Sequence, residues 1–346
     1  MAAGSRVRVG FLGCGLIAGF HARGLRAVDG AEIVAAHDID GARAARFARE
    51  WAGTAAAAAG SAEEVIAASD AVYVCTWTST HQALVEAVVA AGKPVFCEKP
   101  LATDLAGAEA MTAAIARSGV VNQVGLVLRA SPSFRWLRHL VNQPEAGPLM
   151  NIVFRDDQYL PTQGMYQSTW RADRTLAGAG TLLEHSIHDL DLLRWLMGPI
   201  RSVSANLGYV HGLDGIDDQA SVLLVAASGA QAALISVWHD VLSRASQRRV
   251  EAFCQAGVFT LTHDWRGPVS GELASGPIET LEGQRLTEAA AGADGLAGSP
   301  DAAFIDAVRT PKQAHPGFEV ALEAHRLADA AYRSAAAGGS PISVGA

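Results

Sequence analysis

Short apolar runs alternate with amphipathic stretches over the first part of the chain, up to about residue 125. The apolar runs predict buried strands, and the stretches between them, with apolar residues at helical spacing, predict helices. The strand candidates lie at residues 7–12, 32–37, 71–76, 94–97 and 120–124. Alternation of this kind is typical of βαβ units, so the sequence predicts a Rossmann-type, doubly wound parallel sheet over residues 1–125.

The pattern changes beyond residue 125. Strand-like runs follow one another closely at 149–155, 203–210, 220–226, 230–238, 249–254 and 258–262, and helical stretches interrupt them at 181–197 and 318–336. Runs of strands with few helices predict an α+β domain with a large, mostly antiparallel open sheet over residues 126–346. Residues 266–300 are rich in Gly, Ala and Ser with little periodicity, and we expect an exposed excursion there.

Length, charge and cysteine content restrict the class of protein. A chain of 346 residues suits two domains. No apolar stretch reaches the ~18 residues of a membrane span, and no long apolar region precedes the first strand, so we expect neither a span nor a secretory signal. Four scattered cysteines favour reduced thiols in the cytoplasm, and a net charge of −8 without a basic cluster argues against nucleic-acid binding.

A glycine turn joins the first strand to a helix that begins near Leu16. Gly13 permits the tight turn, and Gly15 lets a phosphate approach the backbone, while Ala18 takes the small position where helix and strand pack. The N–H groups at the helix start, including those of Leu16 and Ile17, and the positive end of the helix dipole then point at one spot. The sequence therefore predicts a pyrophosphate site.

Asp38 directly follows the second strand, close to the ~20-residue offset after the glycine turn at which a carboxylate binds the adenosine ribose. A carboxylate there repels a 2′-phosphate, so NAD is the predicted cofactor and NADP is less favoured. Arg43 lies near enough to weaken that preference. The alternative is that Asp38 caps the next helix, a role that Asp40 could fill equally well.

The segment Glu98-Lys99-Pro100 directly follows the fourth strand. Ligands of open parallel sheets bind at the carboxyl ends of the strands, so Lys99 is a candidate catalytic residue and Glu98 a candidate cofactor contact. A bend at the proline could fix the direction of the lysine, since X-Pro bonds can be cis. The alternative is a solvated surface lysine.

Thr76, Trp77 and His81 follow the third strand and are candidates for contact with the nicotinamide ribose. They present hydroxyl and aromatic groups at the same edge of the sheet as Lys99. The alternative is a polar strand-to-helix turn that is capped by its own hydroxyls.

Ionisable residues are densest in the predicted helix at 181–197. Glu184, His188 and Asp191 share one face of a continuous helix, and His185 and Asp189 form a second polar line. A carboxylate one turn before a histidine can fix its tautomer and raise its basicity. A zinc site is not favoured because no H-E-x-x-H order is present, so we expect no metal; a water-facing polar helix is the other alternative.

These motifs resemble those of the Gfo/Idh/MocA oxidoreductases, which include inositol and glucose dehydrogenases. The resemblance covers nearly the whole chain through the glycine turn, DAVYVCT with the following histidine, AGKPVFCEKPLA, Arg129, Trp170-Arg171 and GAGTLLEHSIHDLDLLRWLMG. It implies that Lys99 is the catalytic lysine and His188 the acid/base histidine. Glu184 stands where the family often has aspartate, and Trp77 where it commonly has proline. The family's second domain usually forms dimers or tetramers through its open sheet.

The resemblance implies NAD-dependent oxidation of a secondary alcohol on a sugar, inositol or related polyol. His188, oriented by Glu184 and assisted by Lys99, would accept the hydroxyl proton. The candidates to line the substrate pocket are Arg129, Trp170, Arg171, His185 and Asp189. The alternatives are an NADP-dependent reductase of another carbonyl, an imine or a dihydrodiol, and a non-catalytic NAD-binding regulatory protein.

Overall fold

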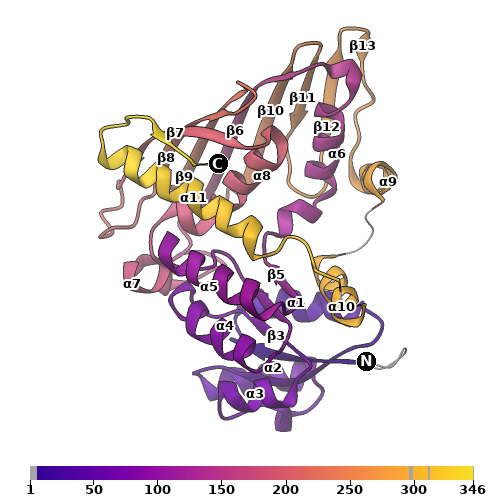
Figure 1. The fold of residues 1–346 in the computed structure, drawn as a ribbon, viewed down its shortest axis with the longest axis vertical. Coiled ribbons are helices and arrows are strands. Elements are labelled where there is room, and N and C mark those ends of the chain that lie inside the picture. Colours follow the sequence, from indigo (N-terminus) through magenta and orange to yellow (C-terminus); the bar gives the residue numbers. More distant parts are fainter. Residues whose placement is uncertain (1–5, 296–298, 311, 346) are drawn as a thin grey trace. The chain divides into compact units, whose positions relative to one another are not determined.

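The computed structural model describes residues 6–295, 299–310 and 312–345, which form two compact units (Figure 1). The first comprises the described residues up to Leu126 and those in 299–322. The second begins at Val127, runs to residue 295, and includes 323–345. The sequence analysis assigns 299–322 to the second domain, whereas the structure packs this returning segment into the first unit.

The first unit contains a five-stranded parallel sheet in the order β2-β1-β3-β4-β5, which confirms the predicted doubly wound sheet. Its strands are β1 Val7–Leu12, β2 Ala31–His37, β3 Ala71–Val74, β4 Val95–Cys97 and β5 Asn122–Val124. All but one of the residues in β1, and every residue of β3, β4 and β5, are buried. Near-continuous apolar runs are what a sheet covered on both faces requires.

Several helices of this unit begin directly after a residue whose side chain caps them. They are α1 Leu16–Arg26, α2 Gly41–Trp51, α3 Ala62–Ala68, α4 His81–Ala90, α5 Leu105–Ser118 and α10 Pro300–Arg309, with the short 3₁₀ turns η1 Ala55–Ala57 and η2 Thr78–Thr80. The side chains of Asp40, Ser61 and Asp104 accept backbone N–H groups at the starts of α2, α3 and α5. The Asp104 cap fixes the start of α5 at Leu105.

An aromatic stack forms part of the core of the first unit. Tyr73 lies between Phe11 and Phe96, with ring centroids 5.0 and 4.6 Å apart, and Phe304 of α10 meets Tyr73 edge-on at 5.4 Å. All four rings are fully buried. Helix α10, which the sequence analysis does not predict, therefore completes the core beside α1.

The second unit contains a nine-stranded sheet in the order β13-β12-β11-β10-β6-β9-β8-β7-β14. Its described strands pair antiparallel except for β6 with β9, which confirms the predicted mostly antiparallel sheet. They are β6 Leu149–Tyr159, β7 Ile200–Gly208, β8 Gln219–Ala226, β9 Gln231–His239, β10 Gln247–Cys254, β11 Gly257–Leu261, β12 Val269–Leu273, β13 Gly276–Pro277 and β14 Ile342–Ser343.

Helices cover one face of this sheet (Figure 1). They are α6 Pro132–Val141, α8 Ile187–Met197, α9 Gly283–Asp294 and α11 Phe318–Ala336, while the short helix α7 spans Arg174–Ala177. The short 3₁₀ turns are η3 Val127–Ala130, η4 Pro144–Ala146 and η5 Thr169–Ala172. On the other face, alternate strand positions carry exposed apolar side chains, among them Val153, Leu223, Ile235, Phe253 and Val258.

The expected exposed excursion at 266–300 is wrong for most of its length. Residues 269–294 contain β12, β13 and α9, and Leu286 and Ala290 of α9 are fully buried. Residues 296–298 of the predicted segment lie outside the described residues. Small residues hid the pattern, because a helix that packs through alanine and a single leucine shows little hydrophobic periodicity.

The predicted continuous helix at 181–197 is also wrong, because it is broken at Ser186. Thr181–His185 form one π-helical turn, and α8 begins only at Ile187. Asp217 holds the start of this turn, since its carboxylate accepts the N–H groups of Gly180 and Leu182 at 2.8 and 3.0 Å. A Cβ on Gly180 would lie 1.8 Å from the Asp217 carbonyl oxygen, so only glycine permits this approach.

None of the helices within the described ranges is long and apolar enough to cross a membrane.

Candidate active site

The glycine turn leaves an open cradle at the start of α1. Gly13 has φ +86°, and a Cβ on it would lie 2.5 Å from the Cys75 carbonyl oxygen, so the turn itself requires glycine. A Cβ on Gly15 would meet no described atom within 4 Å. Gly15 is also the N-cap of α1 and provides no side chain to satisfy the first N–H groups. These donors, at Leu16 and Ile17, suit a diphosphate.

Asp38 fastens the glycine turn to the end of β2. Its Oδ2 accepts the N–H of Cys14 and its Oδ1 that of Asp40, both at 2.9 Å. The cap of α2 is Asp40, whose carboxylate accepts the N–H groups of Ala42 and Arg43, so Asp38 is not the helix cap. Burial, with the Asp38 carboxylate second, raises the pKa of the Cys14 thiol to about 12, so the thiol stays neutral beside the cradle.

The half-exposed Arg43 guanidinium lies 3.7 Å from Asp38 Oδ1. This is the cation that the sequence analysis names as a weakening influence on the preference for NAD. Because it faces the carboxylate, its charge is partly neutralised at the position where the adenosine ribose would bind.

The turn that carries Lys99 is held from inside the sheet. The Lys99–Pro100 peptide bond is cis. Glu98 is buried, and its Oε2 accepts the backbone N–H of Lys99 at 3.0 Å, while its Oε1 lies 2.8 Å from His21 Nε2. Glu98, predicted as a cofactor contact, thus uses both carboxylate oxygens within the protein.

His81 is a second internal support of this turn. Its Nδ1 lies 2.9 Å from the Pro100 carbonyl oxygen and its Nε2 3.2 Å from that of Thr76. Only 1% of His81 is exposed, and burial lowers its pKa. The ring of His81 thus links the two loops, and its position beside the cofactor stays a prediction. Thr76 Oγ1 accepts the Thr80 hydroxyl at 2.8 Å, while Trp77 is half-buried at the start of η2.

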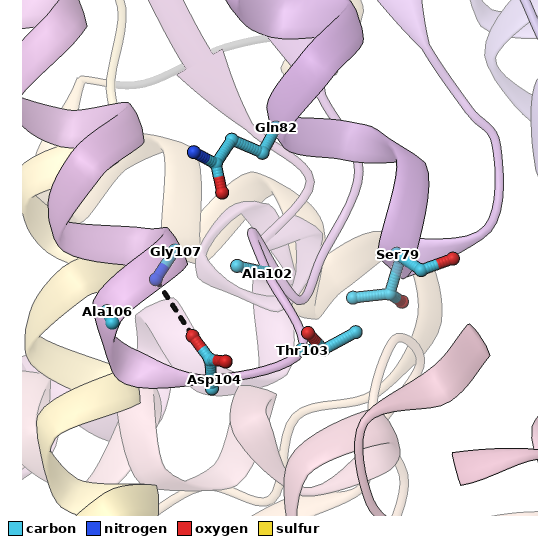
Figure 2. A pocket seen from close by; sticks show the side chains of 8 residues that line it. Ser79, Gln82, Ala102, Thr103, Asp104, Ala106 and Gly107 are labelled. Atoms are coloured by element: carbon cyan, nitrogen blue, oxygen red, sulfur yellow. Dashed lines mark hydrogen bonds between the residues drawn. The ribbon is translucent and has the colours of Figure 1, made fainter. Parts of the chain in front are cut away.

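A polar pocket of about 330 Å³ lies next to these loops, between the start of α4 and the start of α5. Figure 2 shows the Gln82 and Thr103 side chains around it and the bond from the Gly107 N–H to Asp104. It is lined by Thr78, Ser79, Gln82, Ala102, Thr103, Asp104, Ala106 and Gly107. Thr78 and Ser79 belong to the hydroxyl-rich segment 76–81 that the sequence suggests for the nicotinamide ribose, whereas the other lining residues were not predicted. The polar pair that follows Leu101-Ala102 is the signal that could have indicated the pocket.

In the second unit, Glu184, Arg171 and Trp170 form a chain of contacts. Arg171 Nε lies 2.7 Å from Glu184 Oε1, and the Arg171 guanidinium carbon lies 4.5 Å from the centre of the Trp170 ring. Glu184 is on the π turn, whereas His188 is on the first turn of α8 and is 8% exposed. Glu184 therefore has a cationic partner of its own, which the expected single helix face did not include.

His185 and Asp189 belong to a buried charge network rather than to an open surface. Arg248 Nε lies 2.5 Å from Asp189 Oδ1, and its Nη2 lies 3.2 Å from Asp156 Oδ2. His185 Nε2 lies 3.0 Å from the same Asp156 oxygen. Burial raises the pKa of Asp189 to about 7, although Arg248 opposes the shift. Asp189 is 0% exposed, so the predicted substrate contact is corrected to an internal one.

Sequence reasoning missed Arg248 and Asp156. The signal was present in β10, where Arg248 alternates with Val250, Ala252 and Cys254 on the buried face. A charged residue at such a position needs buried partners of opposite charge.

Arg129 is likewise paired internally. Its Nε and Nη2 donate to the two carboxylate oxygens of Asp191 at 2.8 and 2.7 Å, and its guanidinium carbon lies 5.4 Å from the centre of the Trp195 ring. Burial raises the pKa of Asp191, and the bond from Arg129 counteracts this. Arg129 thus forms a bidentate pair that fixes α8, and its contact with the substrate stays a prediction.

No group of three or more His, Cys, Asp or Glu side chains among the described residues is arranged to hold a metal ion.

Comparisons with known proteins agree with this organisation. A model of an oxidoreductase family with an NAD-binding Rossmann fold matches residues 7–126, and one of the GFO/IDH/MocA C-terminal domain matches residues 134–260. The inositol 2-dehydrogenase of Cereibacter sphaeroides is 38% identical over 231 residues, 64% of each chain. That of Burkholderia lata is 37% identical over 232 residues, which are 64% of this chain and 65% of the relative. The matched region thus spans less than two thirds of these relatives.

A crystal structure from Sinorhizobium meliloti 1021, of a candidate myo-inositol dehydrogenase, is similar over 98% of this chain and 100% of its own. The TM-score is 0.77 and the sequence identity 28%.

Proposed function

The chain belongs to the Gfo/Idh/MocA oxidoreductases, and from this premise we propose that it is an NAD-dependent dehydrogenase of a secondary alcohol on an inositol, sugar or related polyol. The first unit is an NAD-binding Rossmann domain. The observation that carries the proposal is the first unit's combination of an open glycine cradle with a lysine on an internally braced turn. The substrate class follows from the relatives named inositol 2-dehydrogenase.

The residues of the first unit fit NAD. The unfilled space at Gly15 admits a diphosphate, and Asp38 places a carboxylate at the end of β2, where a 2′-phosphate would be repelled. Arg43 faces this carboxylate and would bind a 2′-phosphate only after leaving it. We therefore propose NAD rather than NADP as the cofactor.

Lys99 and His188 are the proposed catalytic residues. When bound, the nicotinamide would supply the hydride acceptor for the carbinol carbon. The protein must then take the hydroxyl proton, which we assign to His188, while the Lys99 ammonium stabilises the negative charge that develops on the oxygen. In the reverse direction the same two groups polarise the ketone and return the proton. Glu184, which forms an ion pair with Arg171, is the proposed residue that orients the histidine.

The proposed substrate contacts are Trp170 and Arg171, which are partly exposed. Arg129, His185 and Asp189 are assigned a different role. Their charges are paired within the second unit, so they hold the π turn and α8 in position. An aromatic face and a guanidinium are groups that can bind a hydroxylated ring.

The test is an assay of NADH absorbance with NAD and a panel of inositols and sugars. Lys99→Met should reduce turnover by about 10²- to 10³-fold, the range for removal of one group that stabilises a developing oxyanion. Lys312→Met is the matched control, because Lys312 is exposed, and it should keep wild-type turnover. Turnover of imines or dihydrodiols with NADPH, and not of polyols, would replace the proposed reaction. NADH binding without any turnover would indicate a regulatory protein.

We also propose that copies of the chain assemble as a homodimer or homotetramer through the helix-free sheet face. Leu223 of β8 is 59% exposed on this face, and the apolar surface continues through Ile235 on the neighbouring strand β9 and Val153 on β6, the next strand beyond β9. A row of exposed apolar side chains on a paired sheet is typical of an interface. Leu223→Glu should yield monomers in sedimentation analysis, and an unchanged sedimentation coefficient would reject this surface.

A cytoplasmic location is proposed from the cysteines. Cys14, Cys75, Cys97 and Cys254 are all buried free thiols. Such thiols are typical of a reducing compartment. Export of the full-length protein to the medium or periplasm would contradict this location.

A further inference from the structure

A buried chain of charged groups lies behind the turn that carries Lys99. His21 on α1 places its Nε2 2.8 Å from Glu98 Oε1 and its Nδ1 2.7 Å from Asp301 Oδ1. His21, Glu98 and Asp301 are only 4%, 5% and 6% exposed. The Tyr73 hydroxyl donates to the same Asp301 oxygen at 3.2 Å. Three segments that are far apart in the sequence thus meet at one imidazole.

Both nitrogens of the His21 ring face a carboxylate, and a neutral imidazole can donate only one hydrogen bond. The arrangement therefore calls for the imidazolium form. Burial alone would disfavour this cation, but the hydrogen bonds with Asp301 and Glu98 outweigh it and raise the pKa of His21 to about 10. The group is a permanent cation between two carboxylates at neutral pH.

Two glycines leave space for the buried carboxylates that contact His21. A Cβ on Gly125 would lie 2.3 Å from Glu98 Oε1, and one on Gly24 would lie 2.3 Å from Asp301 Oδ2. Neither glycine has a positive φ, so what each provides is space for a carboxylate. The sequence thus leaves space for both carboxylates that flank His21.

This series of hydrogen-bonded charged groups ends at the backbone N–H of Lys99. Glu98 Oε1 is held by His21, and Glu98 Oε2 accepts the Lys99 N–H at 3.0 Å. His21 is also part of α1, whose first turn forms the glycine cradle. One helix therefore carries the cradle at its start and the imidazole that holds the lysine turn at its middle.

We propose that His21 is a positioning residue for Lys99. It acts through the Glu98 carboxylate and holds the lysine turn in a fixed position relative to α1, the helix that begins at the dinucleotide cradle. This proposal rests on the proposed function, because it names a further residue for the same reaction. His81 braces the other side of the turn through the Pro100 carbonyl. The role of His21 is distinct because it connects the turn to α1.

Two variants of His21 separate positioning from mere stability. In His21→Gln the side-chain amide nitrogen falls near the place of Nε2 and keeps a donor for Glu98. In His21→Asn it falls near the place of Nδ1 and keeps a donor for Asp301. Both lose the positive charge and one hydrogen bond, so both lower the thermal stability to a similar extent. Only His21→Asn releases Glu98.

The expected result is a difference in turnover without a difference in cofactor binding. His21→Asn should lower kcat by about 10- to 100-fold relative to His21→Gln, because small displacements of a reacting group are costly. The Kd for NADH should agree between the two variants within about twofold, since the cradle is untouched. Equal kcat values for the two variants would overturn the proposal.

A second readout needs no turnover. The chain has three lysines, Lys93, Lys99 and Lys312, so reductive methylation with isotope-labelled formaldehyde gives a lysine NMR spectrum that can be assigned by substitution. His21→Asn should shift the Lys99 signal, while the signals of Lys93 and Lys312 stay in place. A Lys99 signal identical in wild type, His21→Gln and His21→Asn would overturn the proposal. If the wild type turned over no polyol, the proposed function would fail, and this spectrum would still decide the role of His21.

Discussion

Gly13 and Gly15 stand two residues apart in the same turn, yet the structure predicts opposite consequences when each is replaced by alanine. Gly15 has φ −80° and ψ −167°, an extended conformation that alanine adopts without strain. A Cβ there meets no described atom within 4 Å. Gly15→Ala should therefore leave stability unchanged or raise it by about 0.4–1 kcal/mol, because the unfolded chain loses freedom.

The same methyl group would occupy the surface on which the diphosphate has to lie. Forcing one extra methyl group into a packed contact costs about 1–3 kcal/mol, which corresponds to an NADH affinity about 5- to 150-fold weaker. The effect should appear in the Kd from NADH fluorescence, with the thermal transition of the free protein unchanged.

Gly13→Ala should instead destabilise the protein itself. At φ +86° an alanine costs roughly 1–2 kcal/mol, and its Cβ would lie 2.5 and 2.7 Å from the carbonyl oxygen and carbon of Cys75. These are backbone atoms of the neighbouring strand end and cannot rotate away, so we expect a total of about 3 kcal/mol or more. The measurement is chemical denaturation of the free protein.

Gly292→Ala is the control for a glycine replacement away from the cradle. Gly292 lies in α9, and its Cβ would meet no described atom within 4 Å. It should raise stability slightly and leave NADH binding alone. If Gly15→Ala bound NADH as tightly as wild type, the diphosphate would not lie against Gly15, and the reasoning about the cradle would be refuted.

Three further predictions concern charged residues. Asp191→Ala should lower the free energy of unfolding by about 3–5 kcal/mol, because the buried Arg129 guanidinium loses its bidentate carboxylate partner; a loss below 1 kcal/mol in urea denaturation would contradict the buried pair. His21 has its pKa raised from 6.5 to about 10, so the unfolded chain releases this proton first as pH rises. Stability should fall between about pH 6.5 and 10, by up to about 1.4 kcal/mol per pH unit, and His21→Gln should remove this slope in denaturation series from pH 7 to 9.5. Asp38→Ala should weaken NADH binding by about tenfold, since the Cys14 N–H loses a charged acceptor. It should also narrow the ratio of the NADPH to the NADH dissociation constant, because the carboxylate that repels a 2′-phosphate is removed. An unchanged ratio in fluorescence titrations would show that Asp38 does not contact the ribose.

The sequence was sufficient for the parts of the fold that rest on local pattern. Continuous apolar strands and the glycine turn identify the Rossmann unit, and alternation identifies the large sheet. Helix α9 was not predicted because it packs mainly through alanine. The π turn before α8 was not predicted because it depends on Asp217, a residue distant in sequence. Local periodicity contains no information about such a partner.

The roles of individual charged residues were harder to predict for the same reason. Arg129 was expected at the substrate from the family resemblance, and His185 and Asp189 also because charged groups gathered on a helix suggest chemistry. Their partners Asp191, Asp156 and Arg248 show internal pairing instead. Asp191 had been predicted on the face of His188, and its pairing with Arg129 depends on the three-dimensional fold. A sequence motif identifies which residues are ionisable, whereas burial and pairing depend on the complete structure.

The return of residues 299–322 to the first unit has a consequence for biosynthesis. The N–H of Val124 in β5 donates to the carbonyl of Pro316, and the N–H of Phe318 donates to the Asn122 side chain. When β5 has left the ribosome, Pro316 and Phe318 have not yet been synthesised. All strands from β6 to β13 must be translated before them. The nascent Rossmann unit therefore stays incomplete at this edge until the inserted sheet has been synthesised. A gene fragment that ends at Leu126 encodes an incomplete domain.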